Sequence, residues 1–98
     1  MVVSLLGKVA IVTGGSGGLG RVHCLSLAKA GCNVALTGYS HYEKAEAVAR
    51  EIEGLGRKAI ALKLDVADLD QVSDGVRKAE ATLLQIDILV NNAAYGII

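Results

Sequence analysis

Thr13-Gly14-Gly15-Ser16-Gly17-Gly18-Leu19-Gly20 contains five glycines in eight residues and follows an apolar run at residues 9–13. A short continuous apolar run predicts a strand buried on both faces, and residues 18–30 predict a helix that stops at Gly31. Glycines between a strand and a helix let the backbone turn tightly and approach a ligand without a clash at Cβ. The helix dipole and free N–H groups there suit a pyrophosphate. A plain turn without a ligand is the weaker alternative, because it does not need so many glycines.

The same alternation continues along the chain. Residues 33–37, 59–64 and 86–90 form three further apolar runs, and helical patterns lie between them. A second helix is predicted to begin at a capping box of Ser40 and Glu43 and to stop at Gly56. A third helix is predicted to begin at Asp68, with Asp68 and Gln71 at its cap positions. The order is therefore β-α-β-α-β-α-β.

Each helix is predicted to bury one stripe of side chains. In the first helix this inward stripe comprises Leu19, His23, Ser26 and Leu27. In the second it comprises Ala45, Val48, Ile52 and Leu55, and in the third Leu69, Val72, Val76, Ala79 and Leu83.

Strands that alternate with helices predict a parallel sheet, and right-handed crossovers constrain its order to 3-2-1-4. The fold class is α/β, and the sheet is most of a doubly wound nucleotide-binding sheet. The fourth strand would be an open edge, and one face would have a single helix over it. Because open edges and uncovered faces favour association, we expect the chain to self-associate there.

Two further motifs follow strands. Leu64-Asp65-Val66 follows the third strand, and Asn91-Asn92-Ala93-Ala94 follows the fourth. Together with Thr13-Gly14-x-x-x-Gly18-x-Gly20, they make the chain similar to the short-chain dehydrogenase/reductase family, over essentially its whole length. It also resembles the branch that contains 3-oxoacyl-carrier-protein reductases. The resemblance implies a Rossmann-type sheet in an oxidoreductase that transfers hydride between a nicotinamide cofactor and a carbonyl or alcohol.

The resemblance also implies a cofactor site at the carboxyl ends of the strands. Asp65 would accept a hydrogen bond from the adenine amino group, with Val66 beside the ring, while Asn91 and Ala93 would line the cleft. Asp65 could instead cap the following loop, and Asn91 could also brace the strands. Ala94 replaces a glycine that is usual in the family. The residues implied around the phosphates and the adenine-side ribose are Gly14, Ser16, Gly17, Gly18, Leu19 and Gly20.

Cofactor choice depends on the end of the second strand. NAD-binding relatives place an acid there, but this chain has Gly38, followed by Tyr39 and Ser40. The arginine often used for a 2′-phosphate is also missing, both at Gly17 and at Tyr39. Ser40, near a helix start, could contact a phosphate or could be an ordinary N-cap. The missing acid favours NADP over NAD.

The family's catalytic Tyr-x-x-x-Lys pattern does not occur in this sequence. None of Tyr39, Tyr42 and Tyr95 has a lysine four positions later. We therefore interpret residues 1–98 as a dinucleotide-binding domain truncated before the catalytic half, and we expect no catalysis from it alone. Two alternatives remain: a stand-alone nucleotide-binding or interaction module, and a non-functional product that persists through self-association.

Composition excludes several other classes of protein. The 98 residues carry 10 basic and 10 acidic side chains, so nothing favours a nucleic-acid partner. No apolar run is long enough to span a bilayer, and the start is too short for a secretory signal, so we expect a cytoplasmic chain with reduced thiols. Cys24 and Cys32 lack metal-ligand spacing, and no metal site is expected.

Overall fold

The structure is a computed structural model that describes residues 4–15 and 17–92. The predicted alternation of strands and helices is confirmed, although the fourth strand begins later than predicted, at Ile88. The elements are β1 (Val9–Thr13), α1 (Gly18–Lys29), β2 (Asn33–Gly38), α2 (Tyr42–Gly54), β3 (Ala59–Lys63), α3 (Leu69–Leu83) and β4 (Ile88–Asn91).

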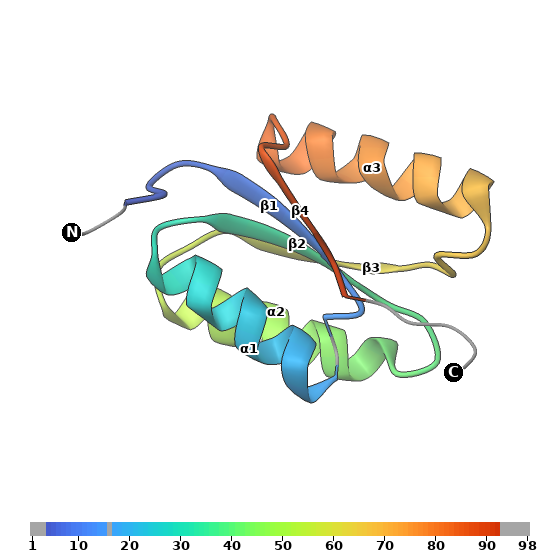
Figure 1. Ribbon diagram of the computed structural model, residues 1–98, viewed down its shortest axis with the longest axis horizontal. Helices are drawn as coiled ribbons and strands as arrows, with labels where there is room; N and C mark the ends of the chain where they lie inside the picture. The colour runs from blue at the N-terminus through green and yellow to red at the C-terminus, as the bar shows by residue number, and fades with distance from the viewer. Residues whose placement is uncertain (1–3, 16, 93–98) are drawn as a thin grey trace.

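The four strands form one parallel sheet in the order β3-β2-β1-β4, as predicted. Helices α1 and α2 cover one face of the sheet, and α3 lies over the other (Figure 1). This arrangement is the one that right-handed crossovers require, since the chain steps outward through β2 and β3 and then returns past β1.

Two apolar layers explain why the strands are continuously apolar. In β1, Val9 and Ile11 face the layer under α3, while Val12 faces the layer under α1 and α2. In β2, Ala35 belongs to the α3 layer and Leu36 to the opposite one. Because both faces of these central strands are buried, they lack the alternation of apolar and polar residues that a half-exposed strand shows.

The predicted helix stripes are partly wrong. In α1 the buried residues are Gly20, Cys24 and Ala28, whereas Leu19 is 64% exposed and Ser26 is also exposed. Small residues face the sheet because they let the helix axis approach it closely, and a leucine-centred pattern misses that choice.

The other two stripes need smaller corrections. Leu55 lies just past the end of α2 and is 45% exposed. In α3 the buried side is Gly75, Ala79 and Leu83, while Leu69 is 79% exposed and Val76 36% exposed. Leu69 and Val76 therefore lie away from the buried side of α3, whereas Val72 packs against the core.

The helix ends show which local signals held. Gly31 and Gly56 have φ of 108° and 85°, so the predicted glycine terminators are confirmed. The predicted capping box at Ser40 is wrong, because α2 has His41 at its N-cap and no side-chain cap. Asp68 does cap α3, accepting hydrogen bonds from the amides of Asp70 and Gln71.

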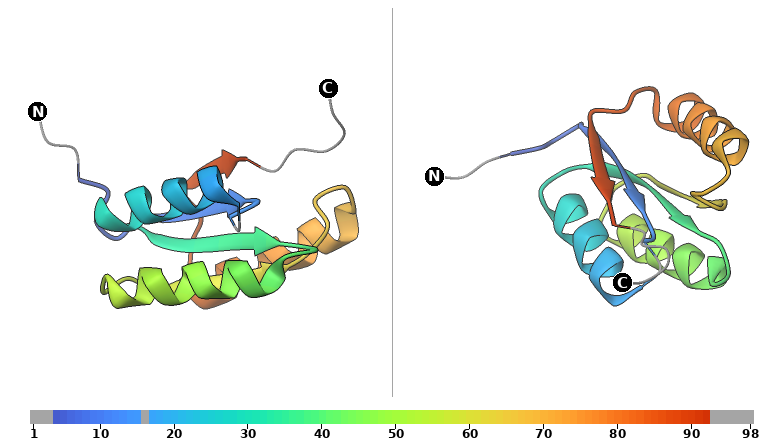
Figure 2. Two further views of the ribbon diagram at one scale, coloured as in Figure 1. Left: turned by 90° about the horizontal axis from the view of Figure 1, so that it is seen from below. Right: turned by 45° about the vertical axis from the view of Figure 1, so that its right-hand side comes forward.

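Strand β4 lies beside β1 at an open edge of the sheet (Figure 2). Leu89 of β4 is 67% exposed on the α3 side. Among the helices within residues 4–15 and 17–92, none is both long and apolar enough to cross a membrane.

Candidate functional site

The register of the sheet brings the predicted site residues together at the carboxyl ends of the strands. Thr13 of β1 pairs with Asn91 of β4, and Gly38 of β2 pairs with Lys63 of β3. Since the strands are parallel, the glycine turn after β1 and the loops after β2 and β3 all begin along this edge. Ligands of open α/β sheets bind at this position.

The glycine turn is held from the β2 side. Gly14 has φ of 69°, a conformation that glycine adopts without strain. Its amide donates to the Thr37 hydroxyl at 3.0 Å. The amide of Gly15 donates to the Thr37 carbonyl at 2.9 Å.

The turn is also held from the β4 side. The Asn92 side-chain amide donates to the Gly14 carbonyl at 3.1 Å, and the Asn92 backbone amide donates to the Thr13 hydroxyl at 3.0 Å. That hydroxyl in turn donates to Asn91 Oδ1 at 3.1 Å. Asn91 therefore braces β1 against β4, the structural role that the sequence left open for it.

The glycines of the turn serve different purposes. A Cβ on Gly15 would lie 2.6 Å from Leu36 Cβ, and one on Gly20 would collide with the Gly14 carbonyl, so these two glycines permit close packing. A Cβ on Gly17 or Gly18 would meet nothing within 4 Å in the described part of the chain. Packing against the described residues therefore does not require glycine at these two positions, and the lack of a side chain there leaves room for a ligand.

The start of α1 suits an anion. Its N-cap is Gly17, which supplies no side-chain cap, and its first turn contains no acidic residue. The first amides of a helix have no intrahelical acceptor, and the helix dipole is positive there. The start of α1 therefore offers amide donors and a positive dipole end, which suit a pyrophosphate.

Asp65 and Val66 lie directly after β3. One carboxylate oxygen of Asp65 accepts from the Ala67 amide at 2.9 Å, so the loop-capping alternative is realised. The Asp65 amide donates to the Gln71 side chain at 2.8 Å, and Gln71 also donates to Asp68. Gln71 therefore occupies the predicted position three residues after the N-cap Asp68, and its side chain also connects this loop to α3.

Tyr39 and Ser40 follow β2 on the surface. Tyr39 is 53% exposed, and Ser40 is exposed and is not a helix cap. A Cβ on Gly38 would lie 3.0 Å from Ala45 Cβ, so this position is packed against α2. Of the remaining predicted site residues, Leu19 is exposed in the first turn of α1, and Ser16 and Ala93 lie outside the described residues.

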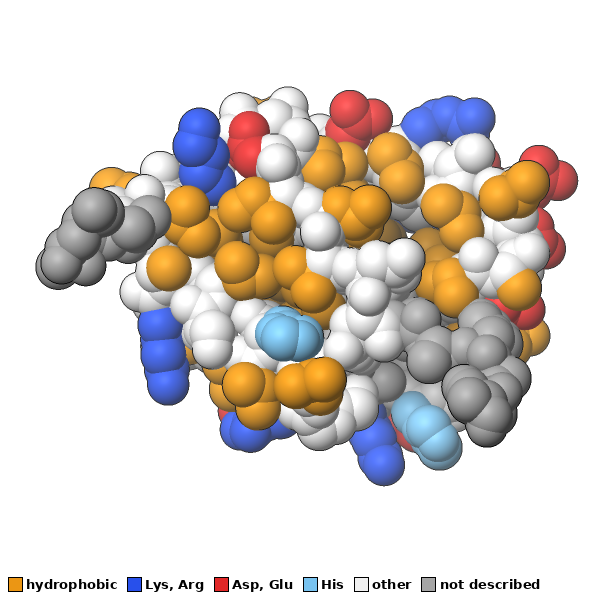
Figure 3. All heavy atoms as spheres, in the orientation of Figure 1, with side chains coloured by type: hydrophobic (Ala, Val, Ile, Leu, Met, Phe, Trp, Pro, Cys, Tyr) orange, Lys and Arg blue, Asp and Glu red, His pale blue; other side chains and the backbone are white. Residues whose placement is uncertain are grey.

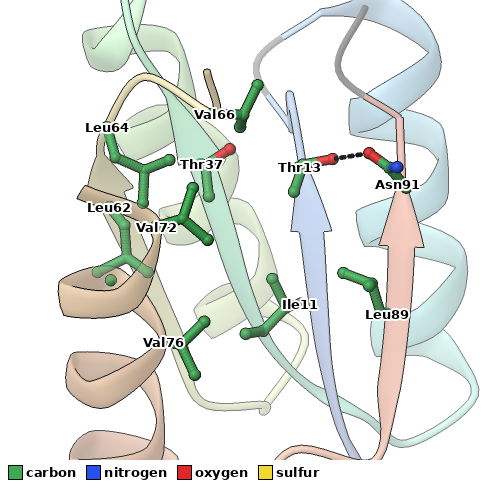
Figure 4. Close-up of a pocket in the computed structure, with 11 residues that line it drawn as sticks. Ile11, Thr13, Thr37, Leu62, Leu64, Val66, Val72, Val76, Leu89 and Asn91 are labelled. Atoms are coloured by element: carbon green, nitrogen blue, oxygen red, sulfur yellow. Dashed lines mark hydrogen bonds between the residues drawn. The ribbon is translucent and has the colours of Figure 1, made fainter. Parts of the chain in front are cut away.

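An apolar cavity of about 260 Å³ opens between α3 and the sheet (Figure 4). Its upper end reaches Thr13, Thr37, Val66 and Asn91, beside the glycine turn. The other residues that line it are Ile11, Leu62, Leu64, Val72, Gly75, Val76 and Leu89. The cavity joins the candidate site to the face of the sheet that α3 covers only in part.

The buried thiol of Cys24 packs beside the glycine turn. Cys24 is fully buried, and its sulfur lies near the position that a Gly15 Cβ would take. Burial raises the pKa of the Cys24 thiol to about 12, because the thiolate would lose its hydration. Cys24 therefore acts here as an apolar packing residue.

Sequence reasoning missed the side chains that hold the site together. Thr37 and Asn92 each hold the glycine turn, and Gln71 holds the Asp65 loop. A threonine ending an apolar run was the available signal for Thr37, but only the pairing of β1 with β2 shows what it contacts.

Comparison with known proteins gives a consistent result. The family model described as short chain dehydrogenase matches residues 8–97. The chain is 43% identical over 90 residues to an L-rhamnose 1-dehydrogenase (NAD(P)(+)) of a Sphingomonas strain, covering 91% of this chain and 35% of the relative. It is 43% identical over 86 residues to a 3-oxoacyl-acyl-carrier-protein reductase of Staphylococcus aureus, covering 88% and 35%.

Solved structures agree with these relatives. A short chain dehydrogenase from Burkholderia cenocepacia in complex with NADP superposes with a TM-score of 0.90 at 44% identity. The match covers 95% of this chain and 38% of that one. A dehydrogenase/reductase from Sinorhizobium meliloti superposes at 0.89 and 42% identity, covering 94% and 36%. The chain thus spans about a third of the length of the proteins it matches.

Proposed function

The chain belongs to the short-chain dehydrogenase family, and from this membership we propose that it forms the dinucleotide-binding part of a nicotinamide-dependent oxidoreductase. Members of this family use NAD or NADP. The observation that carries the proposal is the pair Gly17 and Gly18, where a side chain would meet no other part of the described chain. A pyrophosphate at the start of α1 supplies the reason for glycine there.

The remaining roles follow the geometry of the site. We assign Gly14 and Gly20 to the shape of the turn, and the segment from Ser16 to Leu19 to the phosphates. Asp65 and Val66 would hold the adenine. Asn91 and Ala93 would line the cleft toward the nicotinamide.

For the cofactor we propose NADP in preference to NAD. An acid that could hold both ribose hydroxyls is missing at Gly38, and this position is packed against Ala45. Ser40 is exposed and caps no helix, so its hydroxyl is available for a 2′-phosphate. The NADP complex of the Burkholderia relative is in keeping with this choice.

We further propose that the hydride-transfer chemistry belongs to the whole protein and needs residues outside this sequence. When bound, the nicotinamide would supply the hydride. This chain would hold the adenosine and pyrophosphate half and exclude water from it. Because the relatives are named as a sugar dehydrogenase and an oxoacyl reductase, we propose that the substrate of the whole protein is a carbonyl or alcohol compound.

A titration of the 98-residue chain with ADP, 2′-phospho-ADP-ribose and the whole dinucleotides, by calorimetry or NMR, tests the proposal. We expect a dissociation constant on the order of 0.1–1 mM, or about 4–6 kcal/mol of binding free energy. The adenosine-side fragments should bind nearly as well as NADP. Asp65→Ala should weaken binding by about 1 kcal/mol, because an acceptor for the adenine amino group is lost.

Gly18→Val is the sharper variant, since a branched Cβ would fill the space assigned to the phosphates. We expect it to abolish binding. Gly54→Val is the matched control, because Gly54 also lies at a helix end with nothing within 4 Å of its Cβ position. Equal binding by Gly18→Val and Gly54→Val would remove the proposed phosphate site. A whole dinucleotide that binds a hundredfold tighter than ADP would show that the nicotinamide half is also held here.

Self-association is a second proposal for the 98-residue chain. Apolar side chains are exposed across the face that carries β4 (Figure 3). Leu89 of β4 is itself 67% exposed. Among the described residues, the backbone of β4 pairs on one side only, with β1. An open strand beside exposed apolar residues favours pairing with a second copy.

A further inference from the structure

Thr37 is the one polar residue in the buried core of the part of the chain that the structure describes. Its exposed fraction is 4%, and it lies in β2 between Leu36 and Gly38. A valine would have nearly the same shape and would suit the apolar layers around it. The hydroxyl must therefore be explained by its hydrogen bond and not by packing.

That hydrogen bond fixes the point at which the chain leaves β1. The Thr37 hydroxyl accepts from the amide of Gly14 at 3.0 Å, and Gly14 is the residue with φ of 69°. The carbonyl of the same threonine accepts from Gly15 at 2.9 Å. One residue of β2 therefore satisfies the first two amides of the turn. A buried amide without an acceptor is costly, so loss of the hydroxyl would displace the turn toward another acceptor.

Side chains from both neighbouring strands hold the turn at Gly14. On the β4 side the Asn92 side chain holds the carbonyl of Gly14, at 3.1 Å. On the β2 side the Thr37 hydroxyl is the side-chain contact. The two contacts hold opposite ends of the peptide units around Gly14, and together they set the direction in which the chain enters α1.

We propose that Thr37 is a positioning residue of the dinucleotide site, an inference that rests on the proposed function. Its hydroxyl and its carbonyl accept the hydrogen bonds of the Gly14 and Gly15 amides. The amides that remain for a phosphate are therefore those at the start of α1. Its hydroxyl holds the turn in the path that points those amides at the phosphates. Thr37 itself need not touch the ligand.

Two matched pairs test this role in the 98-residue chain. Thr37→Val removes the hydroxyl at nearly constant volume, and Thr37→Ser retains it. Thr37→Ala differs from Thr37→Ser only by the hydroxyl, so this second pair remains informative if the valine variant fails to fold. Thr82→Val, at an exposed position of α3, controls for the chemical change itself. ADP and adenosine are the probes, and NMR titration measures both affinities.

We expect Thr37→Val to bind ADP roughly tenfold more weakly than the parent, because one preorganising hydrogen bond is lost. For the same reason, Thr37→Ala should bind ADP roughly tenfold more weakly than Thr37→Ser. Adenosine affinity should change less than twofold, because adenosine carries no phosphate. The Gly14 amide should exchange with solvent faster in both variants. A purely structural role would instead lower the affinities for both probes together.

Equal ADP affinity in Thr37→Val and the parent, or in Thr37→Ala and Thr37→Ser, would overturn the inference. So would unchanged exchange at Gly14. A parent chain that binds no ADP while Gly14 exchange still responds to Thr37→Val would overturn the proposed function and the binding role of Thr37 together. The turn contact alone would then stand.

Discussion

At the scale of single residues, the glycine turn contains positions of opposite character. Gly15→Ala should lower the free energy of unfolding by about 1–3 kcal/mol, because the new Cβ would lie 2.6 Å from Leu36 Cβ in a packed core. Gly18→Ala should leave stability equal or raise it by about 0.4–1 kcal/mol, because the space is open and alanine favours a helix. Urea unfolding of the two variants measures the difference. Equal stabilities would contradict this division of the glycines.

The two thiols offer a second test at this scale. Burial raises the pKa of Cys24 to about 12. It also raises the pKa of Cys32, and the charge of Asp87 adds to that shift. Since the thiolate is the reactive form, alkylation of Cys24 at pH 8 should be at least about a hundredfold slower in the folded chain than in urea. Mass spectrometry of iodoacetamide-treated protein follows this rate. Equal rates in both solvents would show that Cys24 is not buried in the folded chain.

At the scale of elements, Asp87 joins the beginnings of β1 and β4. Its carboxylate accepts from the Val9 amide at 2.8 Å and from Gln85 at 2.7 Å, and its own amide donates to the Val9 carbonyl. These hydrogen bonds, the one from Val9 first, lower the pKa of the Asp87 carboxyl below its ordinary value. The contact helps to set the register that places Thr13 beside Asn91.

Because the pKa of Asp87 is lower in the folded chain, its contribution to stability is complete above the ordinary value of 3.8. It is lost as the pH falls through the lowered pKa. Asp87→Asn retains an acceptor but cannot titrate. Its stability should therefore change less than that of the parent between pH 5 and the acid range, as followed by urea unfolding at each pH. Parallel pH profiles would contradict the assignment.

At the scale of the whole molecule, we propose that the chain self-associates through the edge of the sheet formed by β4. Leu89→Lys should reduce self-association, because a charge on β4 opposes both strand pairing and burial of the exposed face. Leu55→Lys is the control, since Leu55 is also partly exposed but lies at the end of α2, over the other face. Sedimentation or light scattering over a range of concentrations measures the effect. A parent chain that stays monomeric at high concentration would contradict the proposed association.

The sequence by itself determined the order of the elements and the parallel sheet, and it predicted the candidate site at the carboxyl ends of the strands. Apolar periodicity and glycine are local signals. The apolar runs predicted β1 and β2, and the ends of α1 and α2 were predicted from Gly31 and Gly56. It also determined the family, through three motifs at strand ends. Local signals were less reliable where one residue suits two roles. Ser40 lies between a strand and a helix and could have been an N-cap or a phosphate contact, but it does not cap α2.

Only the tertiary structure decided which glycines pack and which leave room, because that depends on neighbours from other elements such as Leu36. It also decided that the small residues Cys24 and Ala28 face the sheet while Leu19 does not. The contact of Thr37 with Gly14 joins residues 23 positions apart, across the pairing of β2 with β1. A hydrogen bond of this kind has no periodicity to reveal it, since its partners are set by sheet register and not by spacing along the chain.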